Sequence, residues 1–120
     1  MNQKQIINAY ITLVKLSGVQ MSIKAAHSLY SLRKKLEPTY QFCAEQEQLI
    51  VKKYNGQASN GTIIFADAEC AKKAHEALHD LYELVVDIDF EPVTVNMDDF
   101  KDGTLSLNDL EAFDGLVILI

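Results

Sequence analysis

The chain has 120 residues, of which 48% are hydrophobic and 23% are charged, and its formal net charge is −6. These values are typical of one folded domain and exclude a wholly disordered chain; no run approaches the ~20 apolar residues of a membrane span. Residues 1–60 carry eight Lys or Arg and three Asp or Glu, whereas residues 61–120 carry three Lys and fourteen Asp or Glu. The halves therefore have net charges of +5 and −11, which predicts one electronegative side that attracts basic partners.

The first predicted element is an amphipathic helix near the N-terminus. Apolar residues recur at steps of three and four from Ile6 to Leu16. Asn2 is the expected N-cap, and Gly18 lies where the end of a helix favours a residue in the left-handed conformation. We therefore expect this helix to end near Ser17.

A second, longer helix is predicted after the N-cap Ser22. Its apolar stripe runs from Ile23 to Tyr54 and is broken by Glu47. Pro38 lies in the middle of the stripe, and because the stripe keeps its phase there, we expect a kink rather than a loop. The connection between the two helices is short, which predicts an antiparallel helical hairpin over residues 1–54.

The acidic part, residues 62–120, is predicted to mix helix and strand. Residues 55–61 contain two Asn-Gly pairs and predict a loop, after which residues 62–65 predict a short strand. Asp67 is the expected cap of a third helix over residues 68–84.

Strand patterns return towards the end of the chain. Alternating apolar and acidic residues predict a half-buried strand at 85–91, which Pro92 ends or places at a sheet edge. Residues 93–95 continue that strand, a short helix with a Ser106–Asp109 cap follows, and residues 115–120 predict a buried strand. The expected fold is α+β: a helical hairpin with a long kinked second helix, a third helix, and a small antiparallel sheet of two or three strands.

The two cysteines, Cys43 and Cys70, stand apart in helical surroundings. A disulfide is improbable in a reducing compartment, and free cysteine is usually buried. We interpret both as small core residues.

The sequence His-Glu-Ala-Leu-His at residues 75–79 matches the HExxH pattern of zinc enzymes. On a helix, His75 and His79 would share a face and Glu76 would be the general base. A third ligand is missing, because no histidine follows; the carboxylates that remain candidates for it are Asp87, Asp89 and Glu91. The alternative is a surface helix with a chance match. No nucleophile elbow or phosphate loop is present, so we predict neither an enzyme nor a cofactor, with His75 and His79 as weak metal candidates.

Basic residues concentrate on the second helix, in residues 33–35 and 52–53 and at Lys24. Nucleic-acid binding needs a net basic footprint, and the acidic half would repel phosphate. We therefore interpret the basic run as a solvated helix face and do not expect direct nucleic-acid binding.

The acidic residues of the C-terminal part are the main candidates for partner binding. Three interpretations remain open: a mimic of the phosphate backbone, calcium binding by residues 98–103, or solvation and protection of an edge strand. The calcium interpretation lacks the spacing of an EF-hand loop. The candidate residues are Asp87, Asp89, Glu91, Asp98, Asp99, Asp102, Asp109 and Glu111, and Asp114 belongs to the same acidic set.

Five segments carry a resemblance to a known family. They are residues 2–17 (NQKQIINAYITLVKLS), 23–38 (IKAAHSLYSLRKKLEP), 48–54 (QLIVKKY), the strand around 85–90 and residues 105–113 (LSLNDLEAF). The chain resembles a family of small, functionally uncharacterised proteins of phages and prophages of Gram-positive bacteria. The resemblance implies a phage origin and a helical hairpin followed by a small β element, with no activity and no catalytic residues to carry over. The family pattern does not include His75, Glu76 and His79.

The predicted function is that of a non-enzymatic phage accessory protein that binds proteins in the host cytoplasm. Its acidic half favours an inhibitor of a host defence or nucleic-acid-binding protein that has a basic surface. The alternative is a virion-assembly or tail-module component that self-associates into a homo-oligomer through residues 116–120 and the edge strand. A zinc-dependent hydrolase built on residues 75–79 is the third hypothesis. We expect no membrane association, since no run of apolar residues is long enough to span a bilayer. We expect a cytoplasmic location, since the N-terminal segment lacks a signal-peptide cleavage site.

Overall fold

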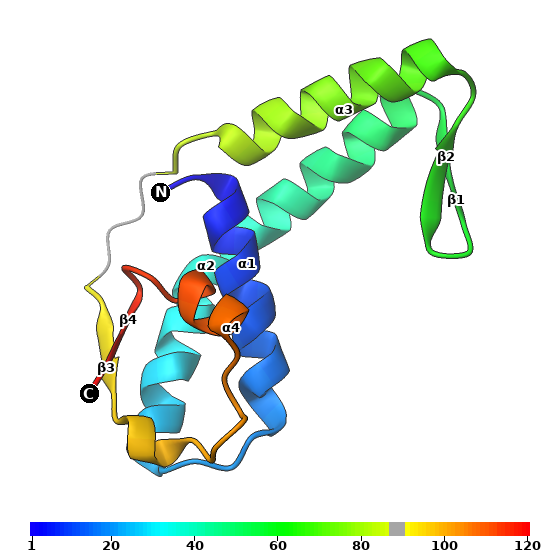
Figure 1. Cartoon of the computed structure of the whole chain (residues 1–120). Coiled ribbons are helices and arrows are strands. Elements are labelled where there is room, and N and C mark those ends of the chain that lie inside the picture. The colour runs from blue at the N-terminus through cyan, green and yellow to red at the C-terminus, as the bar shows by residue number, and fades with distance from the viewer. Residues whose placement is uncertain (87–90) are drawn as a thin grey trace.

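The computed structural model describes residues 1–86 and 91–120, and it has the predicted α+β fold (Figure 1). Its helices and strands, in chain order, are α1 (Gln3–Lys15), α2 (Ile23–Lys53), β1 (Gly56–Ser59), β2 (Thr62–Phe65), α3 (Ala68–Glu83), β3 (Val93–Val95), α4 (Leu107–Ala112) and β4 (Val117–Leu119). Two short 3₁₀ helices, η1 (Leu16–Gly18) and η2 (Met97–Asp99), lie in the connections. No helix within the described residues is long and apolar enough to cross a membrane.

The molecule divides into a body and an arm. We call α1, the part of α2 before Pro38, α4 and the β3–β4 pair the body, and we call the rest of α2, β1, β2 and α3 the arm. Figure 1 shows the arm extending away from the body, with the β1–β2 hairpin at its far end. The radius of gyration is 16.9 Å, whereas a compact chain of this length is expected at roughly 14 Å. The shape is therefore elongated.

The body contains the main hydrophobic core. Its helices bury part of the predicted stripes, although Ile11 and Val14 of α1 are exposed, and β3 and the end of α4 close the core from the other side. Each fully buried side chain of this size contributes about 1.5–3 kcal/mol. The fully buried large side chains of this core are Ile6, Leu32, Leu36, Phe113 and Leu116.

The arm has a much thinner core. Its buried apolar side chains in the described part of the chain are Cys43, Ala74 and Leu81, two of which are small. Small side chains let α2 and α3 approach closely but remove little apolar surface from water. The arm also leaves Leu49 and Ile64 more than half exposed.

The helix starts follow local sequence signals. Asn2 caps α1, as predicted, and forms a capping box with Gln5. Ser106 and Asp109 form the predicted capping box on α4. Ser22 caps α2. The prediction for Gly18 is wrong: α1 passes into η1, and Gly18 does not adopt a left-handed conformation.

The long helix α2 continues through Pro38 without a loop. Figure 1 shows α2 changing direction between its body half and its arm half, in agreement with the predicted kink. Its first residue, Ile23, is 89% exposed, so it does not belong to the buried stripe in which the sequence placed it.

Residues 55–61 are not the loop that the sequence predicted, because β1 occupies most of them. β1 pairs antiparallel with β2, and Ala58 lies opposite Ile63. Asn60 and Gly61 form the tight turn, with φ values of 50° and 79°. Two-residue hairpin turns need positive φ at both positions, which Asn-Gly adopts readily.

The second strand pair also differs from the prediction. β3 and β4 pair in parallel, with Thr94 opposite Ile118, rather than within one antiparallel sheet. β4 confirms the predicted terminal strand, although Ile118 is half exposed. The strand predicted at 85–91 includes residues 87–90, which lie outside the described part of the chain. Val85, just before them, forms an isolated bridge with Asn2.

Candidate protein-binding face

Where the structure describes the predicted acidic residues, some are exposed and others are buried or partly buried. Asp87 and Asp89 lie outside the described residues. Asp99 is partly buried and Asp109 is buried, and both accept hydrogen bonds from other parts of the chain. The carboxylates that are exposed are Glu91, Asp98, Asp102, Glu111 and Asp114.

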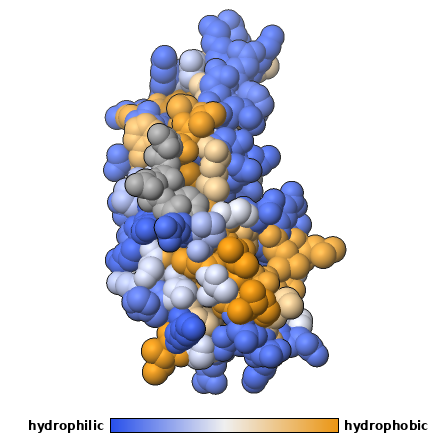
Figure 2. Space-filling model, turned by 90° about the vertical axis from the view of Figure 1, so that its left-hand side faces the viewer, coloured by the Kyte–Doolittle hydropathy of each residue, from blue (hydrophilic) through white to orange (hydrophobic). Residues whose placement is uncertain are grey.

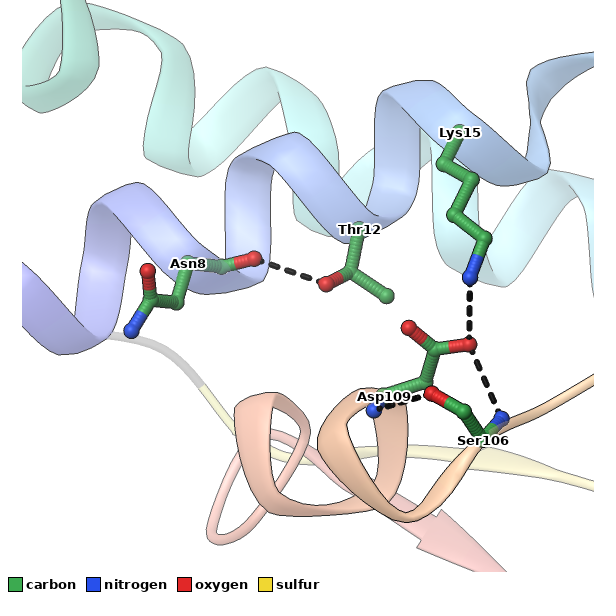
Figure 3. A network of polar contacts seen from close by, with 5 residues as sticks. All are labelled: Asn8, Thr12, Lys15, Ser106 and Asp109. Carbon is green, nitrogen blue, oxygen red and sulfur yellow. Dashed lines mark hydrogen bonds and ion pairs between the residues drawn. The ribbon is translucent and has the colours of Figure 1, made fainter.

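Asp109 connects α4 to α1. Its side chain is 7% exposed and accepts a hydrogen bond from Lys15 Nζ at 2.8 Å (Figure 3). The same carboxylate oxygen accepts from the backbone N–H of Ser106 at 3.0 Å, while the Asp109 N–H donates to Ser106 Oγ. The hydrogen bond from Lys15 is the main cause that holds the pKa of Asp109 below its usual value. Asp109 therefore stabilises the body, and its carboxylate is largely inaccessible to a partner.

Asp99 lies beside the start of α2. Its Oδ1 accepts a hydrogen bond from the backbone N–H of Ser22, the N-cap, at 3.3 Å. A carboxylate is favourable there because the N-terminus of a helix carries partial positive charge. Asp99 is partly buried, so at least part of its role is structural.

Exposed apolar side chains accompany the exposed carboxylates, and sequence reasoning missed most of them. Leu107 at the start of α4 is 85% exposed, and Ile120 is 65% exposed. Figure 2 shows hydrophobic surface below the grey residues, on the side of the molecule that bears β3 and β4. We use the name C-terminal face for a set of exposed residues from the last third of the chain: Glu91, Asp98, Asp102 and Glu111 together with Met97, Leu107, Leu110, Ile118 and Ile120.

The alternation of side chains along a strand explains why two residues of the C-terminal face are exposed. Val117 and Leu119 pack against the body core, so the alternate residues Ile118 and Ile120 point away from it. This alternation was readable from the sequence once the run was taken as a strand with one buried face. Residues 115–120 were instead predicted to be buried throughout.

The HExxH residues lie on the exposed side of α3, in the arm. His75, Glu76 and His79 are all exposed, and the rings of His75 and Phe65 form a T-shaped pair with a centroid distance of 6.0 Å. Within residues 1–86 and 91–120, no group of three His, Cys, Asp or Glu side chains is arranged to hold a metal ion. The structure therefore does not bring Glu91 to the two histidines, and the other third-ligand candidates, Asp87 and Asp89, lie outside the described residues.

Both cysteines are free thiols. Cys43 is fully buried, as predicted, and burial together with the nearby Glu47 raises its pKa to about 11. Cys70 is only partly buried, near the start of α3. The high pKa keeps Cys43 in the thiol form, which is a poor nucleophile.

The basic residues of α2 do not gather into one deep site. Arg33 and Lys34 both lie over the ring of Tyr30, at 5.5 and 5.6 Å from its centroid. Lys34 also pairs with Glu37 along the helix at 3.5 Å. These local contacts are typical of an exposed helix face.

Comparison with known proteins adds no relative: no protein-family model matches the chain, and neither a curated protein nor a solved structure is significantly similar to it.

Proposed function

We propose that this protein acts by binding another protein through the C-terminal face, and that the partner presents a basic surface with apolar residues at its centre. The observation that carries the proposal is that Leu107, Ile118 and Ile120 are exposed in the same third of the chain as the exposed carboxylates. Protein interfaces combine an apolar centre with a polar rim, and exposed apolar patches mark such surfaces.

The charge of the face determines the class of partner. Among the described residues, Glu91, Asp98, Asp102 and Glu111 take part in no ion pair within the chain. Their charges are therefore available to a basic protein, whose approach they would accelerate. Binding should weaken as salt rises, because exposed charges are screened.

The resemblance to phage proteins supports a more specific proposal. The protein is then an accessory factor of a phage, and the partner is a host defence or nucleic-acid-binding protein in the host cytoplasm. Such a partner has a basic surface that normally meets phosphate, and the C-terminal face would compete for it.

Capture from a host lysate with matched charge variants tests the proposal. The test variant carries Asp98→Asn, Asp102→Asn and Glu111→Gln, all at exposed positions of the C-terminal face. The control carries Glu45→Gln, Asp80→Asn and Glu83→Gln, exposed positions of the arm, and loses the same charge. We expect the wild type and the control to retain the same basic protein at low salt and the test variant to lose it. The proposal would be contradicted if both variants retained the basic protein equally, or if the amount retained did not fall as the salt concentration rises.

Self-association is the second candidate, and the exposed side chains of β4 favour it. Ile118 lies in β4 and Ile120 directly after it, and within residues 1–86 and 91–120 the sheet of β4 consists of β3 and β4. Two-stranded sheets leave backbone groups unpaired at their outer edges, which a further strand can join. Light scattering separates the two candidates: a large closed oligomer supports an assembly component, whereas a monomer or dimer supports the binding factor.

The zinc hydrolase remains the third hypothesis, resting on His75, Glu76 and His79 alone. Metal analysis of the purified protein tests it. Stoichiometric zinc that is lost in a His75→Ala variant would support it, and its absence from protein expressed in zinc-supplemented medium would rule it out.

A further inference from the structure

Glu47 on α2 lies between two hollows, one within the arm and one where the arm meets α1 of the body. The larger is a groove of about 620 Å³ between α2, the β1–β2 hairpin and α3. The smaller, of about 350 Å³, lies between α1, α2 and α3. Ala44, Glu47 and Tyr82 line both of them. Glu47 is also the residue that breaks the apolar stripe of α2, which a purely structural helix face would not require.

The surroundings of Glu47 are mainly apolar. Val51, Ile63 and Leu78 form the apolar walls of the groove, beside the ring of Tyr82. In the smaller hollow, the ring of Tyr40 stacks on Tyr10 with a centroid distance of 4.2 Å. A half-buried carboxylate therefore stands between aromatic rings and aliphatic side chains.

The polar contacts of Glu47 are with the uncharged side chains of Cys43 and Tyr82. The Cys43 thiol donates a weak hydrogen bond to Oε1 at 3.6 Å. Burial first, and then the charge of Glu47, raise the pKa of both Cys43 and Tyr82, so both neighbours experience that charge. Among the described residues, no Lys, Arg or His nitrogen lies within 4.0 Å of the Glu47 carboxylate.

Two cations line the hollows without pairing with Glu47. Lys52 lines the groove and Lys4 lines the smaller hollow, and both side chains are exposed. Charges in low-dielectric surroundings are normally paired, and a carboxylate beside aromatic faces is suited to an ammonium or guanidinium group.

We propose that this groove binds a small organic cation with an apolar body, its ammonium or guanidinium group at Glu47 and its body between Val51, Ile63 and Leu78. The volume and the mixture of apolar walls with few convergent polar groups are typical of small-molecule sites. The site is in the arm and the C-terminal face is in the body, so the inference stands independently of the proposed function.

Titration of the 15N-labelled protein with n-hexylammonium tests the site directly. We expect saturable shifts at the amides of Gly56 and Leu78, which line the groove, and none in the body. The neutral n-hexanol and the anionic hexanoate are matched probes of the same length. Both should bind at least tenfold more weakly, because a charge-assisted hydrogen bond is worth at least one such factor.

Two conservative variants assign the charge preference to one residue. Glu47→Gln should bind n-hexylammonium at least tenfold more weakly and no better than n-hexanol. Glu45→Gln removes an exposed carboxylate two residues away on the same helix and should bind like the wild type. If Glu47→Gln does not fold, the comparison of the three probes on the wild type still decides.

Three results would overturn the proposal. Equal affinity for n-hexylammonium and n-hexanol would mean an apolar crevice without recognition of charge. Equal losses in Glu47→Gln and Glu45→Gln would mean a general effect of net charge. Binding of the peptide acetyl-leucyl-lysine-amide tenfold tighter than n-hexylammonium would reassign the groove to a segment of a protein partner.

Discussion

The body and the arm share one helix, α2, yet they are stabilised very differently. On the body side of Pro38, α2 packs into a core with large buried side chains such as Leu32, Leu36 and Phe113. On the arm side, its buried residue is Cys43, and α3 contributes Ala74 and Leu81. A continuous helix can therefore join a well-packed unit to a sparsely packed one. The first presents the C-terminal face, and the second contains the groove at Glu47.

A leucine-to-alanine substitution made once in the body and once in the arm should measure how differently the two parts are packed. Leu36 is 0% exposed in the body, and Leu81 is 6% exposed in the arm. We expect Leu36→Ala to lower the free energy of unfolding by about 3–5 kcal/mol and Leu81→Ala by about 2–3 kcal/mol, since sparse surroundings collapse more easily around a cavity. Urea denaturation provides both values. A larger loss from Leu81→Ala than from Leu36→Ala would contradict the claim that the arm is the more sparsely packed part.

Asp109 should stabilise the body in a pH-dependent manner. Asp109→Asn keeps the shape but weakens the hydrogen bonds from Lys15 and Ser106, and we expect a loss of about 1–3 kcal/mol at neutral pH. The folded pKa of Asp109 lies below its unfolded value of about 3.9. Its contribution is therefore complete above that value and is lost as the pH falls through the folded pKa.

Unfolding of the wild type and Asp109→Asn at pH 7 and pH 3 checks this. The stability gap between the two proteins should narrow at pH 3. A gap of the same size at both values would show that the charge of Asp109 does not matter.

Gly56 should test how the hairpin is held in the arm. A Cβ at this position would lie 2.7 Å from Val51 Cγ1 and 2.9 Å from Phe65 Cε1, so the side chains between α2 and the hairpin must shift to admit it. We expect Gly56→Ala to cost about 1–2 kcal/mol, as overpacking does. Gly18→Ala is the matched control, because nothing lies within 4 Å of its Cβ position.

Hydrogen exchange locates the effect of Gly56→Ala. Faster exchange should be confined to β1, β2 and the adjoining ends of α2 and α3. Faster exchange in the body core as well would show that the arm and the body open together.

Local signals made several elements predictable from the sequence. The cap at Asn2 and the Ser106–Asp109 box depend on residues three positions apart, so they could be predicted without tertiary structure. The Asn60–Gly61 turn was equally local. Its two-residue turn signal was present, but the residues before it lack the β-branched and aromatic side chains that usually indicate a strand.

Other features depend on contacts between residues that are far apart in the sequence, so local patterns do not predict them. β3 and β4 pair in parallel across the intervening α4, which the apolar runs alone do not indicate. Asp109 belonged to the predicted binding set, but its partner Lys15 lies 94 residues away. Glu47 was visible as a break in a stripe, but only the fold shows that α3 and the hairpin surround it.

The most direct test of the central claim, that the C-terminal face of the body binds a protein partner, is a hydrogen–deuterium exchange footprint of the captured complex. The account predicts that the partner slows exchange in η2, α4 and β4 and leaves the amides of α3 and the hairpin unchanged. Slower exchange confined to the arm, with no change from residue 91 to residue 120, would contradict it.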